Sequence, residues 1–470
     1  MPNNFLGGDG LNTALFTFAA QQNESQLEQT FKIDHVLNEK NTVFARYSWG
    51  FQNSNCDAVN GGLPWFPGGP CVLNTKRDPK NLAVNWRTNP TARITNELVF
   101  GFNRLAFDFA DPTTDLNGIQ IESPSVTWPE ILSAGNKREL TTWQLVDNWS
   151  WVRGAHSIKA GINFRWQSHQ DLRGSIGGQN AVQSVNFSRL INTVDGATFG
   201  IPPDINAAFD RAPLESNINF LLGRVGSTGR GFVSRGDQFV AGLYDFTARF
   251  NEYDVYLQDT WKVARNVTVD VGLRWEIKAA PQSSPAGRIR RPNALMTAGA
   301  PPANAVRWET GAIYSTDYHN WAPSVGFSWD PFGKGKTAVR ANYRIAFDRI
   351  NTFVLSSSVS QNLPGQVQGV VNQAYGQAGG RLTGLPVLGP PTIRPSELAQ
   401  PPAFSLNNIT VVDPAFETPT THGWSLSLQQ EVARNTVLEV NCIGRCAYNL
   451  FGLFGAYNSN QTEVFRNGFL

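Results

Sequence analysis

Several segments of this chain place apolar residues at every second position. In segment 42–51 these residues are Val43, Ala45, Tyr47, Trp49 and Phe51. Nearly the same spacing recurs in segments 143–151, 158–166 and 267–275. Successive side chains of a β-strand point to opposite faces, so a period of two gathers the apolar ones on one face. The segments therefore predict strands with one apolar and one polar face.

Short and long connections alternate between these strands. Short turns, which contain turn-forming residues, are predicted at 38–41, 89–91, 153–155, 264–266, 331–336 and 433–435. Long connections are predicted at 50–80, 110–140, 168–248, 277–320 and 349–420. Long structureless loops are uncommon in compact soluble domains, whereas membrane barrels have short periplasmic turns and long extracellular loops. The pattern predicts an all-β fold, a transmembrane antiparallel up-and-down β-barrel of about 13–14 strands in the bacterial outer membrane.

Aromatic or apolar residues also mark the strand ends at a constant spacing of eight residues, as in the pairs Trp143 and Trp151 or Tyr253 and Trp261. At ~3.3 Å per residue and a tilt near 45°, eight steps rise about 19 Å, close to the ~25 Å apolar band of such barrels. Two tryptophan girdles are predicted. The periplasmic one contains Trp86, Trp151, Trp261 and Trp329, and the outer one Trp49, Trp143, Trp166, Trp275, Trp321 and Trp424.

The composition excludes two other classes of protein. Only 16% of the 470 residues are charged, against roughly 25% in soluble domains, while phenylalanine (30) and tryptophan (14) are plentiful. No window offers the ~18 consecutive apolar residues of a membrane helix, so a helical membrane protein is excluded. The net charge of +2 without a basic stripe argues against a nucleic-acid partner.

Three residues depart from the strand pattern. Asp147 and Asp259 fall on the otherwise apolar face, which places them either at headgroup depth or on a local bulge. Near Arg104 the apolar parity of segment 92–109 changes, and this change predicts a bulge at the outer rim.

Charged residues on the polar faces are predicted to line the barrel lumen. There they solvate the interior, and they could also contact a solute or a plug. The candidates are Arg46, Arg87, Lys159, Arg165, Arg274, Arg340 and Arg344.

Signals for catalysis, metals and cofactors are poor, so we expect no enzyme activity and no cofactor. Segment 332–337 ends like a phosphate-binding loop, but Asp330 stands where the first glycine belongs and no helix is predicted to follow. The five histidines lack any metal-ligand spacing.

The four cysteines form two local pairs. Cys56 and Cys71 stand in one Gly/Pro-rich loop and are predicted to form a disulfide. Cys442 and Cys446 are compatible with a terminal staple, two free thiols or part of a metal site. The first residues lack a basic segment followed by an apolar one, so no secretory signal is recognised and we expect the natural N-terminus to be missing.

The hairpins carry a family resemblance. Segments 253–263 with 266–276, 321–337, and 423–431 with 435–440 resemble hairpins of TonB-dependent receptors, especially the Oar-like branch. The resemblance covers about residues 25–450 and implies a 22-stranded barrel plugged by an N-terminal domain and energised by the TonB complex. We recognise no plug and no TonB-contacting box, so we expect an incomplete barrel, with the TonB complex as a partner only if the missing plug is supplied.

The leading functional hypothesis is solute uptake or receptor activity in the outer membrane, with lipid and an unidentified solute as partners. One alternative is a passive porin-like channel of 14 strands. A second alternative, from another class, is a soluble secreted β-sheet lectin or adhesin.

Overall fold

The computed structural model describes most of the chain. The described residues are 3, 14–110, 116–128, 132, 135–176, 179–207, 209–235, 237–284, 288–292, 306–310, 312, 314–349, 366–372, 380–392, 394 and 416–450. No helix among them is long and apolar enough to cross a membrane.

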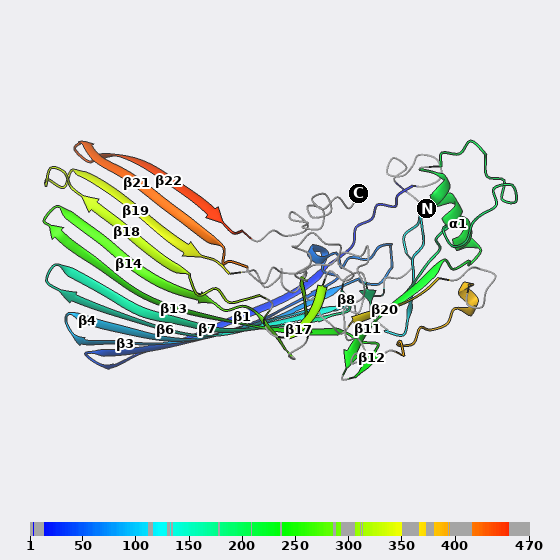
Figure 1. Ribbon diagram of the computed structural model, residues 1–470, viewed down its shortest axis with the longest axis horizontal. Helices are drawn as coiled ribbons and strands as arrows, with labels where there is room; N and C mark the ends of the chain where they lie inside the picture. The colour runs from blue at the N-terminus through cyan, green and yellow to red at the C-terminus, as the bar shows by residue number, and fades with distance from the viewer. Residues whose placement is uncertain are drawn as a thin grey trace.

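One large antiparallel sheet dominates the fold, and it curves like a trough (Figure 1). Twelve strands follow one another in it with each strand pairing with the next, and a short thirteenth strand, β15 (Gln282–Ser284), pairs with β13. The twelve are β1 (Asn23–Asn38), β2 (Asn41–Asn55), β3 (Asn74–Thr91), β4 (Ile94–Ala110), β6 (Asn136–Arg153), β7 (His156–Arg173), β13 (Tyr244–Ala264), β14 (Val267–Lys278), β18 (Trp321–Trp329), β19 (Thr337–Phe347), β21 (Thr420–Ala433) and β22 (Thr436–Tyr448).

Tight turns join the strands along one edge of the trough, which we call the short-turn rim. Gly154 (φ 60°) and Asn435 (φ 63°) adopt left-handed backbone conformations in two of these turns, where glycine and asparagine are the favoured residues. One predicted turn is displaced. Thr91 pairs with Ile94, so the β3–β4 turn lies at 92–93, and residues 89–91 belong to β3 beyond a register shift.

We call the opposite edge the long-loop rim. There the strands are longer than predicted and continue into segments that the sequence assigned to loops. The connections there span residues 56–73, 111–135, 174–243, 279–320 and 348–419. Strands β3, β6 and β7 each have 18 residues, whereas a membrane crossing needs about 9–11. These strands therefore continue well past the bilayer.

Within the membrane-crossing part of the sheet, the register brings the alternating apolar positions of neighbouring strands to one face. Val271 pairs with Val325 and Asp259, while Gly272 on the opposite face pairs with Ser324. Leu273 is 47% exposed and Val271 55% exposed, as expected for side chains that contact lipid rather than a protein core.

The predicted bulge at Arg104 is wrong. The pairing of β4 with β6 is continuous from Ile94 opposite Trp151 to Phe109 opposite Asn136. Instead, the polarity of the two faces reverses past the outer girdle. Arg104 is charged and keeps the outward parity of Phe102, while Phe107 has inward parity. Outside the bilayer the outward face meets a polar environment, which removes the need for apolar residues there.

Parts of three long connections fold together into a β-module on the long-loop side, which we call the cap (Figure 1). The strand β11 (Ser227–Arg235) pairs with β10 (Gln183–Asn186), β12 (Gln238–Val240) and β20 (Gln366–Asn372), and β10 also pairs with β5 (Ile119–Ile121). A small core of Val185, Phe187 and Val225 holds these strands together. The five-stranded sheet thus joins segments more than 200 residues apart.

The helix α1 (Arg211–Leu221) packs on the cap through Phe220, whose ring contacts that of Phe187, and through polar side chains. Asn219, fully buried, donates to the carbonyl of Asn192 at 2.7 Å. Burial alone would raise the pKa of Glu215, but hydrogen bonds from Arg211 and Arg189 outweigh it and lower that pKa. Ion pairing therefore fixes the helix to the loop that carries Arg189.

Candidate functional site on the lumen face

The predicted lumen residues all have inward parity, but only two of them meet in one place. Arg165 on β7 and Arg274 on β14 approach the same group of carboxylates. The other five lie apart along the sheet. Two of them make hydrogen bonds to neighbouring strands: Arg46 donates to Asn81 at 3.4 Å, and Arg340 donates to Gln429 at 2.8 Å. The remaining three are placed by their register partners, which are Thr42 and Glu97 for Arg87, Ser150 and Gln258 for Lys159, and Ser324 and Gly423 for Arg344.

A group of charges that we call the lumen charge cluster lies on the inward face of β7, β13 and β14. Its centre is Lys278, whose Nζ lies 3.2 Å from Asp254 Oδ1, 3.2 Å from Glu276 Oε2 and 3.5 Å from Glu252 Oε2. Arg165 Nη1 lies 3.3 Å from Glu252 Oε2, and Arg274 Nε lies 3.9 Å from Glu276 Oε1. Six side chains on these three strands thus form the cluster: Arg165, Glu252, Asp254, Arg274, Glu276 and Lys278. Arg349, which follows β19, adds one more cation 3.2 Å from Glu252 Oε1.

The cluster combines a buried centre with exposed arms. The side chains of Glu252, Asp254, Glu276 and Lys278 are at most 11% exposed, whereas those of Arg165 and Arg274 are 28% and 44% exposed. Buried carboxylates need partners, because isolated charges away from water are costly. The two arginines are therefore the members that can meet a solute without the centre being opened.

Hydrogen bonds extend the cluster across the lumen face. Asn163 donates to Asp254 at 3.2 Å, and Gln144 donates to Asn163 at 2.7 Å. The guanidinium of Arg274 lies 5.3 Å from the centre of the Tyr256 ring, within cation–π distance. A glycine is required beside that ring, because a Cβ at Gly161 would lie 2.8 Å from Tyr256 Cε1 and 2.4 Å from the Asp147 carbonyl oxygen.

Four members of the cluster are missing from the predicted lumen residues, namely Glu252, Asp254, Glu276 and Lys278. A sequence signal for them exists, because Glu276 and Lys278 continue the inward parity of Arg274. Glu252 and Asp254 likewise precede Tyr256 at inward positions. The sequence pattern alone does not single them out, because they stand beside predicted loops, where the alternation of faces is hard to follow.

The predicted girdle tryptophans lie at the two ends of the apolar face. Trp275 stacks on Trp321 at 5.4 Å between ring centres, and Trp143 pairs in register with Trp166 near the long-loop rim. Seven of the ten are between 38% and 50% exposed: Trp86, Trp143, Trp166, Trp261, Trp321, Trp329 and Trp424. The other three, Trp49, Trp151 and Trp275, are half-buried.

The two carboxylates on the apolar face have polar partners and no bulge. Asp259 Oδ2 lies 2.6 Å from His156 Nδ1, and Asp147 accepts a hydrogen bond of 2.5 Å from Asn96. The register is continuous at both positions. Their place near the short-turn rim is that expected for headgroup depth, where a paired carboxylate is tolerated.

With this geometry established, comparison with known proteins identifies the class. The sequence matches the family described as outer membrane beta barrel domain over residues 1–467. The chain belongs to this family. It is therefore an outer-membrane β-barrel protein of bacteria, and the soluble secreted alternative is wrong. No curated protein matches it.

Solved structures with a similar fold include three outer-membrane proteins. They are the transporter YddB of Escherichia coli (12% identity, 92% of this chain, 41% of that chain, TM-score 0.47), the ferric-catecholate import receptor Fiu of Escherichia coli (12%, 89%, 51%, 0.41) and the ferric enterobactin receptor PfeA of Pseudomonas aeruginosa (9%, 91%, 43%, 0.44). This barrel chain spans about half the length of these structures or less.

The phosphate-loop-like segment of the barrel is a turn closed by its own carboxylate. Asp330 accepts hydrogen bonds from the backbone N–H groups of Phe332 (3.3 Å), Gly333 (3.1 Å) and Gly335 (2.6 Å). These donors are the kind that would bind a phosphate, and the Asp330 carboxylate already takes them. The next residues form β19, so the segment is not followed by a helix.

The four cysteines of the barrel differ in state. Cys56 and Cys71 form a disulfide within the β2–β3 connection. Cys442 and Cys446 are free, exposed and both on the outward face of β22. They are four residues apart on one strand, so their Cα atoms lie about 13 Å apart. This distance is too long for a disulfide between them. No group of metal-ligating side chains occurs in the described part of the chain.

Proposed function

We propose that this barrel is a receptor and transporter of the TonB-dependent type, and that it takes up a solute through a plugged lumen and catalyses no reaction. The observation that supports the proposal most is the lumen charge cluster near the long-loop rim. A water-filled pore needs no buried centre of four charged side chains, whereas a site for one bound solute or for a plug benefits from fixed charges. Arg165 and Arg274 are the proposed solute or plug contacts.

The cap supports the same proposal. It joins parts of three long connections, and its buried Arg230 donates to the carbonyl oxygens of Leu116 at 2.7 Å and Ala181 at 3.1 Å. A folded module on the long-loop side restricts access more than separate loops would. We assign this side to the cell exterior, because barrels of the outer membrane carry their long loops there. The proposal also includes a plug inside the barrel and a contact with the TonB complex that supplies energy. Within the TonB-dependent receptors, we propose that the chain belongs to the Oar-like branch.

The test uses cells that produce the barrel together with a segment that pairs with its two unpaired edge strands and a plug, and a labelled ferric catecholate, the solute named for Fiu. We expect the cells to accumulate the solute, and this accumulation should stop when a protonophore dissipates the proton gradient. In planar bilayers the purified protein should give no open conductance. The Arg165→Gln and Arg274→Gln variants should accumulate less, while Lys159→Gln should behave as the wild type. Accumulation insensitive to the protonophore, together with an open conductance, would favour the passive channel and refute energised uptake.

A further inference from the structure

Every tight turn of the short-turn rim carries a positively charged side chain. The turns lie along one edge of the trough (Figure 1) and span residues 39–40, 92–93, 154–155, 265–266, 330–336 and 434–435. One arginine or lysine stands in or directly beside each of them, and all six are exposed. We call these residues the basic row; they are Lys40, Arg93, Arg153, Arg265, Lys334 and Arg434.

The basic row makes no ion pair in the part of the chain that the structure describes. Carboxylates near this rim already have other partners. Asp330 accepts hydrogen bonds from three backbone N–H groups of its own turn. Asp259 Oδ2 lies 2.6 Å from His156 Nδ1, and Glu431 Oε2 lies 3.5 Å from Lys336 Nζ. The six cations are therefore available to a partner outside the chain.

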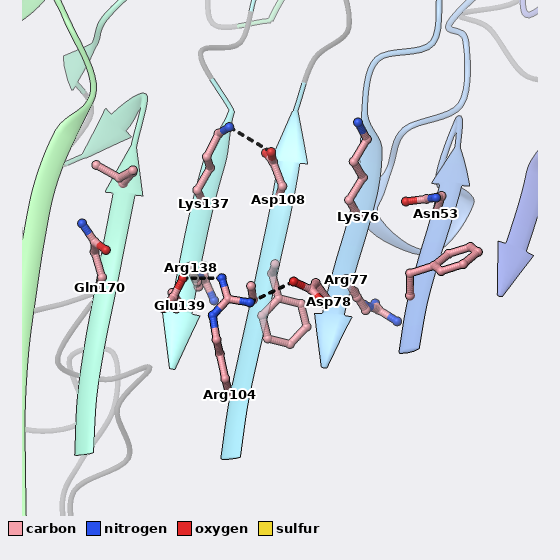
Figure 2. Close-up of a pocket in the computed structure, with 14 residues that line it drawn as sticks. Asn53, Lys76, Arg77, Asp78, Arg104, Asp108, Lys137, Arg138, Glu139 and Gln170 are labelled. Atoms are coloured by element: carbon pink, nitrogen blue, oxygen red, sulfur yellow. Dashed lines mark hydrogen bonds and ion pairs between the residues drawn. The ribbon is translucent and has the colours of Figure 1, made fainter. Parts of the chain in front are cut away.

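Cations on the outward face at the long-loop rim are arranged differently. Figure 2 shows Arg104 between two carboxylates, with Nη1 2.9 Å from Asp78 Oδ2 and Nη2 2.7 Å from Glu139 Oε2. Lys137 Nζ lies 2.9 Å from Asp108 Oδ2. A cation beside a carboxylate attracts a further anion less than an unpaired cation does, because the two fields partly cancel.

The net charge shows the same asymmetry. The six turns and the strand residues directly beside them contain seven cations, which are the basic row and Lys336, and two carboxylates, Glu39 and Asp330. Seven cations less two carboxylates give this rim a charge of +5, whereas the whole chain has +2, so the remaining residues sum to −3. The positive charge of the chain is thus concentrated at one rim.

The basic row lies where the barrel wall leaves the membrane on the periplasmic side. Arg153 stands two residues past the girdle residue Trp151, and Arg265 stands four residues past Trp261. At ~3.3 Å per residue and a tilt near 45°, these cations lie about 5–9 Å beyond a girdle that is itself at headgroup depth. The headgroup layer of one leaflet is only ~5–8 Å thick. The charged ends therefore reach the aqueous periplasm.

The row is not confined to the side of the wall that faces lipid. Arg153 has the outward parity of Trp151, whereas Arg93 directly precedes the outward-facing Ile94 and has inward parity. Lipid headgroups contact only the outward side of the wall. They would neutralise part of the row and leave the rest, so the partner has to reach across the rim.

The spacing of the row indicates the kind of partner. Neighbouring turns are two strands apart, so the cations repeat at intervals of roughly 10–14 Å along the rim. Folded protein partners bind through compact patches with a buried apolar centre. A long row of single cations matches instead a polymer that repeats its anions. The bacterial cell wall lies on this side of the outer membrane, and its peptides carry free carboxylates.

From these observations we infer that the basic row binds the carboxylates of cell-wall peptides. Each exposed ion pair is weak, but several pairs formed with one polymer act together, because after the first contact the others form at high effective concentration. The contact would hold the barrel against the cell wall through its turns alone. This inference depends on the assignment of the short-turn rim to the periplasm and not on the transport proposal.

The test measures co-sedimentation of the protein with isolated cell-wall sacculi, after purification in detergent together with a segment that pairs with its two edge strands. Wild type should sediment at low salt and be released as the salt concentration rises, because exposed charges are screened. An exposed ion pair changes binding by roughly two- to five-fold, so R93Q/R265Q/R434Q should weaken retention about 10- to 100-fold. The matched control K76Q/K80Q/K137Q removes the same charge from the long-loop side and should sediment as the wild type.

Further measurements identify the partner. Sacculi with amidated carboxylates should not retain the wild type, and phosphatidylglycerol vesicles test a lipid source of the anions. Heat-modifiable migration verifies the fold of each variant, and R265Q alone, with a two- to five-fold expected loss, replaces the triple variant if that one does not fold. Equal sedimentation of the two triple variants, equal retention on native and amidated sacculi, or binding to the vesicles but not to sacculi would overturn the inference, the last by identifying lipid headgroups as the partner.

Discussion

At the scale of single residues, the same type of side chain has opposite consequences on the two faces of this sheet. A cation on the inward face can be held by three carboxylates, as for Lys278, whereas a cation at the middle of the outward face would contact hydrocarbon. The difference follows from parity alone, because neighbouring residues of one strand point in opposite directions. Two substitutions test it.

Val271→Arg should destabilise the barrel by about 2–4 kcal/mol, because Val271 is 55% exposed on the apolar face near the middle of β14. The neighbouring Asp270→Asn should have a mild effect, since Asp270 faces inward and an amide can still accept the hydrogen bond from Thr260. Denaturant titrations that follow heat-modifiable migration measure both. Equal losses in the two variants would contradict the assignment of faces.

Lys278→Met should leave Glu252, Asp254 and Glu276 without their shared cation. Removing one partner of a buried ion pair costs about 3–5 kcal/mol, because a buried charge is left uncompensated. Here that charge is Asp254, since Glu252 and Glu276 keep Arg165 and Arg274. We expect a loss of stability in this range by the same titration. Lys159→Met is the control, because Lys159 is exposed on the same face and should change stability by less than about 0.5 kcal/mol. If both variants were equally stable, the cluster would not be a structural unit.

At the scale of elements, the strands are longer than the membrane they cross, and their polarity reverses where they leave it. On β4, Phe100 and Phe102 have outward parity inside the apolar band, and Arg104 and Asp108 have it above the band. The reversal needs no bulge, since the environment of the outward face changes while the strand geometry stays regular. Inward apolar groups near the long-loop rim, such as Phe246 and Phe250, are at most 5% exposed.

Single cysteines on β14 and β4 should report this reversal. In intact outer membranes, Val269→Cys and Leu273→Cys should be shielded from a water-soluble maleimide, while Thr268→Cys and Arg274→Cys should react, because only the latter two face inward. On β4, Phe102→Cys should be shielded and Asp108→Cys should react although both have outward parity. Labelling of Phe102→Cys at the rate of Asp108→Cys would place the membrane boundary elsewhere.

At the scale of the whole molecule, the main sheet has two edges among the described residues. β1 pairs only with β2 and β22 pairs only with β21. An unpaired strand edge in hydrocarbon is unfavourable, because its backbone N–H and C=O groups have neither protein nor water partners. Closure requires strands that join these edges, whether from another segment or from another chain.

Membrane insertion of the chain by itself tests this requirement. Expressed with an added signal peptide, the described sheet alone should aggregate or be degraded, whereas co-expression with a segment supplying the joining strands should give a heat-modifiable barrel. A variant with Pro at Leu438, inside the β22 edge, should prevent that rescue, and Pro at Arg434, in the adjacent turn, should be milder. A protease-resistant monomer from the lone chain would show that it closes without help and would favour the passive channel.

The sequence by itself determined the strand class, the separation of faces and the outer-membrane location of this protein. Those features depend on local periodicity: Val43 to Phe51 or Val267 to Trp275 have the same alternation whatever they pair with. The turn at Asp330 is also determined locally. The sequence alone argues against a phosphate loop there, because Asp330 replaces the first glycine, and in the structure this carboxylate accepts hydrogen bonds within its own turn.

Only the tertiary structure decided which side chains meet. Glu252 and Lys278 are 26 residues apart and come together through the β13–β14 register, and the cap joins β5, β11 and β20 across more than 200 residues. The sequence pattern also suggested a bulge at Arg104, because it records polarity but not the position of the membrane boundary. Period-two alternation is a property of one strand, whereas register, loop association and membrane depth depend on contacts between distant segments.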